Sequence, residues 1–301
     1  MHTLFSDDGS VVVLSSSGLG SDTDLWWVLA GVCRTLGYVG IVVLAGFAVF
    51  TAWIWPGMRH VTRARDLAGA GAALCALTTV ATPYAVAGGH SPELSARQLT
   101  LSAVRVGLSL VAAGVLLVPR RALGPLRATR LATTLGGSAL ILTYVLMSDA
   151  WGGPLAVVKV VATFAHIGAT VAWLGGLAAL ILVVLPVRGV RGMSRCFGRF
   201  SPLAATCVGV LVVSGTVHAW IVLAEHDVAV PRQFVLALLV KTAIVGLMLL
   251  LGNIGRVHHQ RVRRQRPLSA HNEGVLAAGI GGELVCGAVV LVATAVLVSV
   301  A

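Results

Sequence analysis

Residues 154–185 read PLAVVKVVATFAHIGATVAWLGGLAALILVVL, and Lys159 and His166 are the only ionisable side chains in this stretch. About 20 apolar residues in a helix cross the roughly 30 Å hydrocarbon core of a bilayer, where no water satisfies open backbone groups. The stretch is long enough, and its apolar residues lack the period-two alternation that a lipid-facing strand requires. It therefore predicts a transmembrane helix.

Seven further segments have the same character, at 25–53, 66–88, 99–118, 129–147, 200–224, 234–255 and 274–300. Of the 301 residues, 57% are hydrophobic and 11% are charged, whereas a soluble globular chain carries roughly 25% charged residues. This composition excludes most soluble folds. We predict an all-α polytopic membrane protein, with a polar extracytoplasmic tail over 1–24 and one bundle of eight transmembrane helices over 25–301.

The distribution of basic residues predicts the orientation. Short loops rich in Arg and Lys remain in the cytoplasm, and the first, third, fifth and seventh loops carry 16 of the 22 basic residues. The opposite loops hold only Arg97 and Arg232, together with most of the acidic residues. Both termini are therefore expected outside. The net charge of +11 is interpreted as this topology signal, so no nucleic-acid partner is expected.

Seven ionisable side chains inside the predicted spans stand out as candidates: Arg34, Arg105, Lys159, His166, His218, Lys241 and Glu283. A charge at the bilayer centre costs at least about 2.5–3.5 kcal/mol on insertion scales, so each needs a partner, a wet cavity or a function. Their estimated depths predict a polar funnel that opens outward, lined by Arg34, Arg105, Lys159, Lys241 and Trp173. Alternatively, the long basic side chains extend to the outer headgroups and only anchor their helices.

Helical spacing predicts which side chains share a face. His166 follows Lys159 by seven residues on the fifth span, while Cys207, Ser214 and His218 line one face of the sixth. If these faces and the eighth span converge, they form a ligand set suited to copper, consisting of His166, His218, Cys207 and Glu283. The alternative for each histidine is a neutral imidazole that hydrogen-bonds a neighbouring Ser, Thr or carbonyl group and joins two helices.

The predicted outer loops add His90, His226 and Asp227. Acidic groups beside an imidazole can concentrate a cation at the mouth of the funnel. These residues are therefore candidates for outer capture of the metal, and the alternative is that they are solvated loop residues.

Short motifs occur in order from the fifth span to the C-terminus: Phe164-Ala165-His166, Ala172 to Gly176, Arg199-Phe200-Ser201, Ser214-Gly215-Thr216 with Ala219-Trp220, Lys241, Asn253 to Arg256, and Glu283. Together they resemble the copper-resistance protein D (CopD) family, from about residue 154 onward. The resemblance implies a bacterial inner-membrane protein of copper uptake or tolerance, often associated with a periplasmic copper protein of the CopC type. Where this chain has His218, the family more often has Asn.

The leading hypothesis is a copper carrier that captures copper outside, holds it at His166 with help from His218 or a thiol, and releases it inward. A b-type haem redox protein is an alternative, because two histidines can ligate a haem, although helical rise places these two roughly 8 Å apart in depth. A third hypothesis is a non-transporting accessory subunit that delivers copper to an oxidase. With no Walker motif, Ser/His/Asp arrangement or catalytic zinc signature in the sequence, no enzyme activity is expected.

Overall fold

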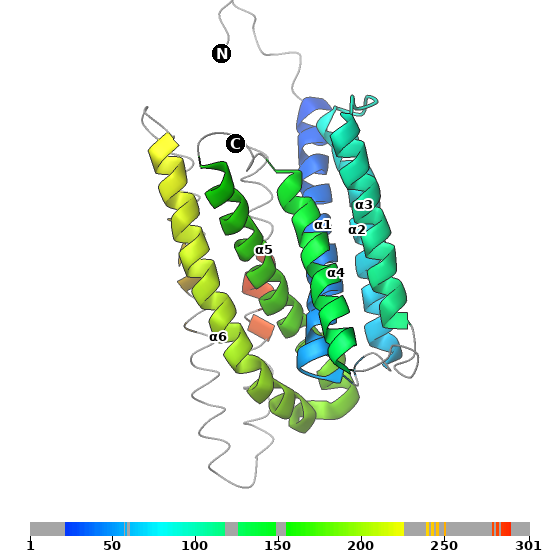
Figure 1. Cartoon of the computed structure of the whole chain (residues 1–301), viewed down its shortest axis with the longest axis vertical. Coiled ribbons are helices and arrows are strands. Elements are labelled where there is room, and N and C mark those ends of the chain that lie inside the picture. Colours follow the sequence, from blue (N-terminus) through cyan, green and yellow to red (C-terminus); the bar gives the residue numbers. More distant parts are fainter. Residues whose placement is uncertain are drawn as a thin grey trace, which may run out of the picture.

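The computed structural model describes residues 22–56, 58, 61–117, 126–148 and 155–225, together with isolated positions between 239 and 289 (Figure 1). This part of the chain is helical and contains no strand. A five-residue π-helix, η4 (Leu180–Val184), joins the fifth helix to the sixth. The helices are α1 (Asp22–Trp53), α2 (Thr62–Val86), α3 (Ala96–Leu117), α4 (Leu126–Leu146), α5 (Ala156–Ala179) and α6 (Leu185–Glu225).

Five of the helical stretches in the described residues are long and apolar enough to cross a membrane: Leu25–Trp53, Thr62–Val86, Ala96–Val115, Ala156–Gly189 and Gly192–Ile221. The apolar part of α4, Arg130–Leu146, is shorter. The prediction of an all-α, multi-pass membrane protein is thus confirmed for this part of the chain. The predicted spans 234–255 and 274–300 lie outside the described residues apart from isolated positions, as does the tail up to residue 21, so the number of eight helices stays a prediction.

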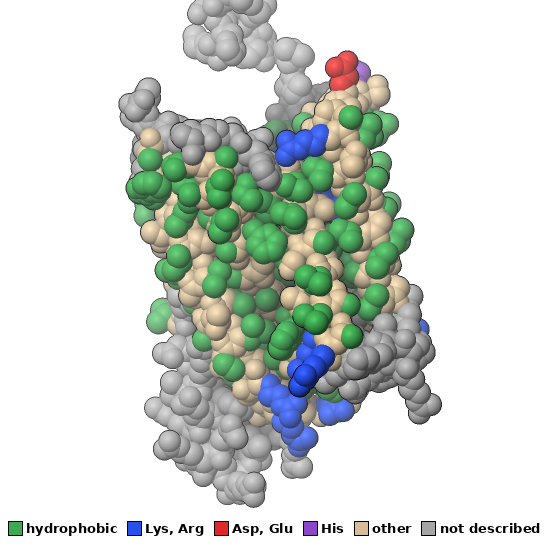
Figure 2. Space-filling view, viewed as in Figure 1, with side chains coloured by type: hydrophobic (Ala, Val, Ile, Leu, Met, Phe, Trp, Pro, Cys, Tyr) green, Lys and Arg blue, Asp and Glu red, His purple; other side chains and the backbone are tan. Residues whose placement is uncertain are grey.

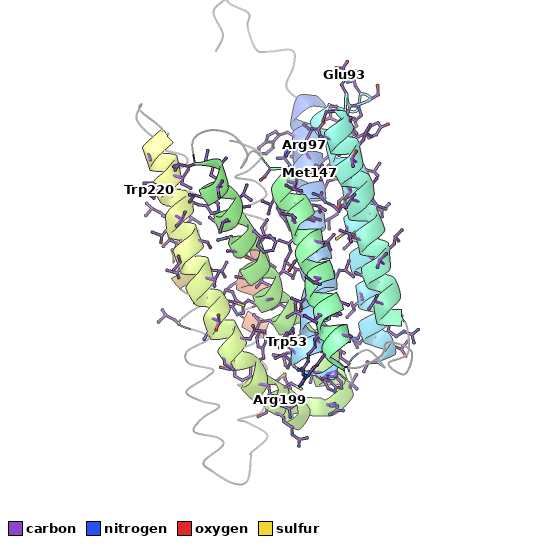
Figure 3. All side chains as sticks on the ribbon, viewed as in Figure 1. Trp53, Glu93, Arg97, Met147, Arg199 and Trp220 are labelled. Carbon is purple, nitrogen blue, oxygen red and sulfur yellow. The ribbon has the colours of Figure 1, made fainter. Side chains whose placement is uncertain are left out.

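Consecutive helices run in alternating directions through one bundle (Figure 1). Trp53 and Arg199 mark one end, whereas Glu93, Arg97, Met147 and Trp220 lie toward the other (Figure 3). Most of the basic side chains visible in Figure 2 gather at the Trp53 and Arg199 end. This separation agrees with the basic loops that the sequence places on one side, while the orientation of the two ends in the membrane stays a prediction.

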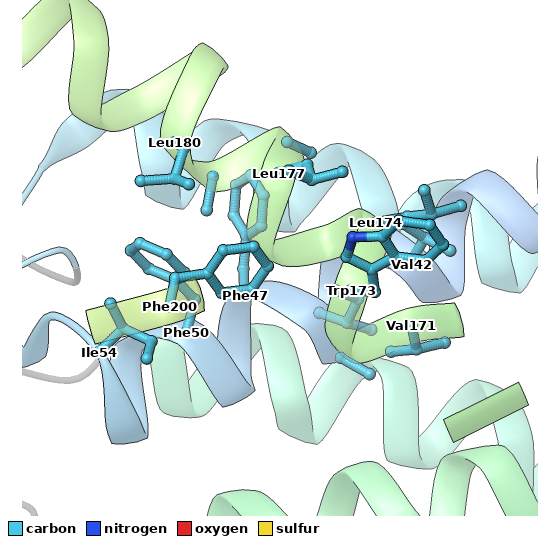
Figure 4. Close-up of a cluster of buried hydrophobic side chains, with 14 of the residues drawn as sticks. Val42, Phe47, Phe50, Ile54, Val171, Trp173, Leu174, Leu177, Leu180 and Phe200 are labelled. Atoms are coloured by element: carbon cyan, nitrogen blue, oxygen red, sulfur yellow. The ribbon is translucent and has the colours of Figure 1, made fainter. Parts of the chain in front are cut away.

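The apolar core lies where α1, α5 and the first half of α6 meet. Phe47, Phe50 and Phe200 are each 1% exposed, and the rings of Phe50 and Phe200 pack at a centroid distance of 6.3 Å (Figure 4). Trp173 and Leu177 of α5 belong to the same cluster. Aromatic rings from three helices therefore fill the centre at the basic half of the bundle and exclude solvent from it.

Two glycines let α1 and α5 approach closely. A Cβ atom built on Gly46 would lie 2.5 Å from the Cα atom of Gly175 and 2.7 Å from the carbonyl oxygen of Val171. Small residues of this kind allow backbones to pack tightly in membranes, where close van der Waals contact drives helix association. This crossing fixes α5 against the centre of the bundle.

The chain reverses direction at Gly189, a kink inside α6. This residue has φ 62° and ψ −173°, a left-handed backbone conformation that glycine adopts without steric cost. The part of α6 directly after the kink passes across the basic end of the bundle, and the long remaining part runs back beside α5 (Figure 1). This path places the second half of α6 next to α5, where Ser214 contacts His166.

Candidate functional site

His166 of α5 and His218 of α6 lie together. Their ring centroids are 5.9 Å apart, and the ring planes are nearly perpendicular at 82°. Both side chains are half-buried. The rings therefore lie together despite the difference in depth of roughly 8 Å that helical rise suggests.

Ser214 anchors the ring of His166 to α6. The Oγ atom of Ser214 lies 2.9 Å from Nδ1 of His166 and 2.7 Å from the carbonyl oxygen of Val210. Ser214 is 4% exposed, so water competes little for these bonds. The hydroxyl of Thr170, one turn after His166, donates to the carbonyl oxygen of His166 at 2.8 Å. The imidazole is thus held at the α5–α6 contact by the side chain of Ser214, whereas Thr170 bonds the backbone of His166.

Cys207 lies apart from the histidine pair. It precedes His218 by 11 residues on α6, which corresponds to about 16 Å along the helix axis. Its side chain is 5% exposed and packs in the apolar core. Within the described ranges, no three His, Cys, Asp or Glu side chains are close enough to hold one metal ion. The structure therefore brings together two of the predicted ligands, both imidazoles.

Lys159 and Trp173 flank His166 on α5. Each is seven residues away, so they lie about 10 Å on either side of it along the axis. Lys159 is half-buried, whereas Trp173 is 5% exposed and belongs to the core. The α5 face thus changes from polar at one end to tightly packed at the other, with His166 between them.

Arg105 belongs to a separate polar cluster with α4. Its Nε atom donates to Oγ1 of Thr143 at 3.1 Å, and Nη2 donates to the carbonyl oxygen of Thr143 at 2.9 Å. The guanidinium carbon lies 3.8 Å from the ring centroid of Tyr144. Since α4 ends at Leu146, this cation meets the negative end of the helix dipole and an aromatic face, both of which stabilise it.

The remaining predicted site residues do not join the histidine pair in the described structure. Arg34 is half-buried on α1, and His90 is exposed at the turn after α2, where Nδ1 lies 3.2 Å from the carbonyl oxygen of Ala87. Four candidates lie outside the described residues: Lys241, Glu283, His226 and Asp227. Sequence reasoning missed Thr143 and Tyr144 as partners of Arg105, although both stand in the last turn of a predicted span.

Replacing Arg105 by lysine is expected to destabilise the bundle. Lysine keeps the charge but cannot bond two oxygen atoms in a planar fork and stack on Tyr144 at the same time. Losing hydrogen bonds to a charged group costs about 1.5–3 kcal/mol, measurable as a lower free energy of unfolding in detergent. Arg97 provides the matched control, because it bonds the carbonyl oxygen of Leu146 at 2.9 Å but is exposed. Arg97→Lys should cost less than about 0.5 kcal/mol, and equal losses in the two variants would contradict this account.

Comparison with known proteins identifies a relative of part of this chain and a matching family. Copper transport protein CutJ of Bacillus subtilis (strain 168) is 30% identical over 162 residues, which cover 51% of this chain and 28% of that protein. The chain thus matches only a part of this longer relative. No solved structure matches the chain significantly. The segment 194–297 begins within α6 and includes Ser214 and His218. It matches the family described as Copper resistance protein D, which confirms for this segment the resemblance expected from the sequence.

Proposed function

We propose that this chain is a copper carrier of the bacterial inner membrane, and that His166 and His218 hold the ion between its entry from the outer side and its release inward. The observation that carries the proposal is the pair of imidazoles on neighbouring membrane helices, 5.9 Å apart between centroids. Imidazole nitrogen is a ligand that suits copper. The family match and the name of the relative support copper as the ion.

The ring separation fits a shared ion. A metal–nitrogen bond of about 2.0–2.1 Å on each side places the centroids of two opposed imidazoles about 6 Å apart, close to the 5.9 Å between His166 and His218. Two neutral imidazoles bring no negative charge, so they bind an ion without adding a charged ligand to the membrane interior. Glu283 and Cys207 stay proposed as further ligands at other stages of binding.

The polarity of α5 supports access from the outer side. Lys159 lies toward the end of the bundle opposite the basic loops, and Trp173 lies toward the basic end inside a packed core. An ion could therefore reach His166 from the Lys159 side while Trp173 closes the other side. With both termini outside, as we propose, His90, His226 and Asp227 would stand near the entrance, where a CopC-type periplasmic protein could deliver copper.

Metal analysis of the purified full chain and copper uptake by vesicles containing it test this proposal. We expect a single bound copper ion per chain and accumulation of copper inside the vesicles, both lost in the His166→Ala/His218→Ala double variant. Vesicles that bind copper without accumulating it would contradict transport and favour an accessory subunit. A Soret band in the absorption spectrum of the same preparation would favour the b-type haem alternative. Under both copper hypotheses, the carrier and the accessory subunit, the chain is a transporter or accessory protein rather than an enzyme.

A further inference from the structure

The hydroxyl group of Ser214 has two close neighbours with different hydrogen-bonding capacities. One is the carbonyl oxygen of Val210, 2.7 Å from Oγ, and the other is Nδ1 of His166, 2.9 Å from Oγ. A carbonyl oxygen only accepts hydrogen bonds, whereas the nitrogen of a neutral imidazole either donates or accepts, depending on the tautomer. The position of a single hydroxyl hydrogen therefore decides the chemistry of His166.

The short distance to Val210 locates that hydrogen. Two oxygen atoms 2.7 Å apart are at the normal spacing of an O–H···O bond, and without a hydrogen between them their lone pairs would repel. The carbonyl oxygen of Val210 carries no hydrogen, so the Ser214 hydroxyl must supply it. The carbonyl oxygen of Leu211, at 3.3 Å, lies on the same preceding turn and can share this hydrogen. Ser214 therefore presents a lone pair, and no hydrogen, to His166.

It follows that Nδ1 of His166 carries a hydrogen and donates it to Ser214. We propose that Ser214 is a positioning residue that holds neutral His166 in the Nδ1–H tautomer and so makes Nε2 the metal-ligating atom. A partner of this kind fixes both the tautomer and the orientation of a ligating histidine. That Nε2 ligates a metal ion, and that this ion is copper, rests on the proposed function; the tautomer belongs to the metal-free protein.

The arrangement of α6 fits this role. His218 follows Ser214 by four residues, so the acceptor for Nδ1 and the second imidazole stand one above the other on one helix face. Gly215 lies beside the same ring, since a Cβ atom built there would be 4.0 Å from Cε1 of His166. The Nδ1–Cε1 edge of the ring therefore faces α6. One face of α6 thus orients the first ligand and supplies the second.

Nitrogen-15 NMR of the copper-free full chain, labelled at histidine, tests the tautomer directly. The signals of His166 are those lost in a His166→Gln variant. In the wild type we expect a protonated Nδ1 and an unprotonated Nε2, and in Ser214→Ala a shift toward the other tautomer. Thr216→Ala is the matched control, because Thr216 makes the same bond to the preceding turn, to the Val212 carbonyl oxygen at 2.9 Å, but is exposed. An Nε2–H tautomer in the wild type would overturn the proposal.

Copper affinity, measured for Cu(I) and Cu(II) separately by competition with a chelator, tests the positioning role. Ser214→Ala should weaken binding about 10–100-fold, Ser214→Thr should restore both the affinity and the tautomer, and Thr216→Ala should change neither. An unchanged affinity in Ser214→Ala despite an altered tautomer would overturn the positioning role. If the wild type bound neither ion, the proposed copper function would fail, while the NMR result would still decide the tautomer.

Discussion

Alanine at either His166 or His218 is expected to weaken copper binding by more than the roughly 10–100-fold that the loss of a ligand's hydrogen-bond partner costs. The double variant is expected to bind copper little more weakly than either single variant. The reason is that the two rings, at a centroid distance of 5.9 Å, can bind one ion together. Once one imidazole is gone, the other is a single weak ligand, and its removal changes little. Chelator competition with the purified wild type, the two single variants and the double variant measures the four affinities of this double-mutant cycle.

The cycle distinguishes a shared ion from two separate ones. Losses that simply add in the double variant would show that the histidines act independently and would contradict a shared site. His90→Ala is the control for equilibrium binding, because His90 is exposed at the turn after α2 and bonds the Ala87 carbonyl oxygen. If His90 captures copper at the entrance, its loss should slow uptake into vesicles and leave the equilibrium affinity unchanged.

The helices could be predicted well because the bilayer itself prescribes their length. A span must hold about 20 apolar residues whatever the tertiary structure, so predicted segments such as 66–88 and 99–118 overlap α2 and α3 closely. Pro83 does not end α2 early, since it stands in the last turn, which continues to Val86. There a missing N–H group costs a single hydrogen bond of the helix.

The histidine pair could be predicted only in part. Helical period correctly placed Ser214 and His218 on one face of α6, because that relation depends on the sequence spacing alone. The depth of each ring depends on where the outer ends of the two spans lie, and α5 begins at Ala156 and α6 ends at Glu225 rather than at the predicted residues 154 and 224. A depth counted from a predicted span end carries the error in that end, and the length of the side chain displaces the ring further.

The partners of Arg105 could not be predicted for a different reason. One of them is the backbone carbonyl group of Thr143, and every residue has a carbonyl group. What selects it is its place in the last turn of α4, where the carbonyl oxygen of Thr143 accepts only a long bond of 3.3 Å from the Met147 N–H group and can accept a second donor. Which helix end meets an intramembrane arginine is decided by tertiary packing. The depth estimate from which the funnel is predicted contains no information about that packing, so it could not name α4 as the partner of Arg105.

Alanine at Gly46 or at Gly175 is expected to force α1 and α5 apart. The added Cβ at Gly46 meets the Gly175 Cα at 2.5 Å, and the added Cβ at Gly175 meets the Val42 carbonyl oxygen at 2.5 Å. These are backbone atoms, which cannot rotate away as a flexible side chain can. Overpacking costs about 1–3 kcal/mol and occasionally more, and a backbone clash belongs at the upper end of that range. The loss appears as a lower free energy of unfolding in detergent.

Gly209→Ala is the matched control, because a Cβ on this glycine of α6 has no atom within 4 Å. The same side-chain change at an open position should leave stability unchanged or raise it slightly, since alanine favours helix more than glycine does. Equal stabilities of Gly46→Ala and Gly209→Ala would show that the close approach of α1 and α5 does not hold the bundle together.

The double variant Gly46→Ala/Gly175→Ala tests whether the two glycines form one contact. A Cβ on either residue lies 2.5 Å from the Cα atom of the other, so the first methyl group already separates the helices at the point where the second would clash. The combined loss should therefore be smaller than the sum of the single losses, with a coupling of about 0.5–3 kcal/mol. His166 stands on α5 nine residues before Gly175, so a displaced α5 should also weaken copper binding in these variants, whereas Gly209→Ala should keep it.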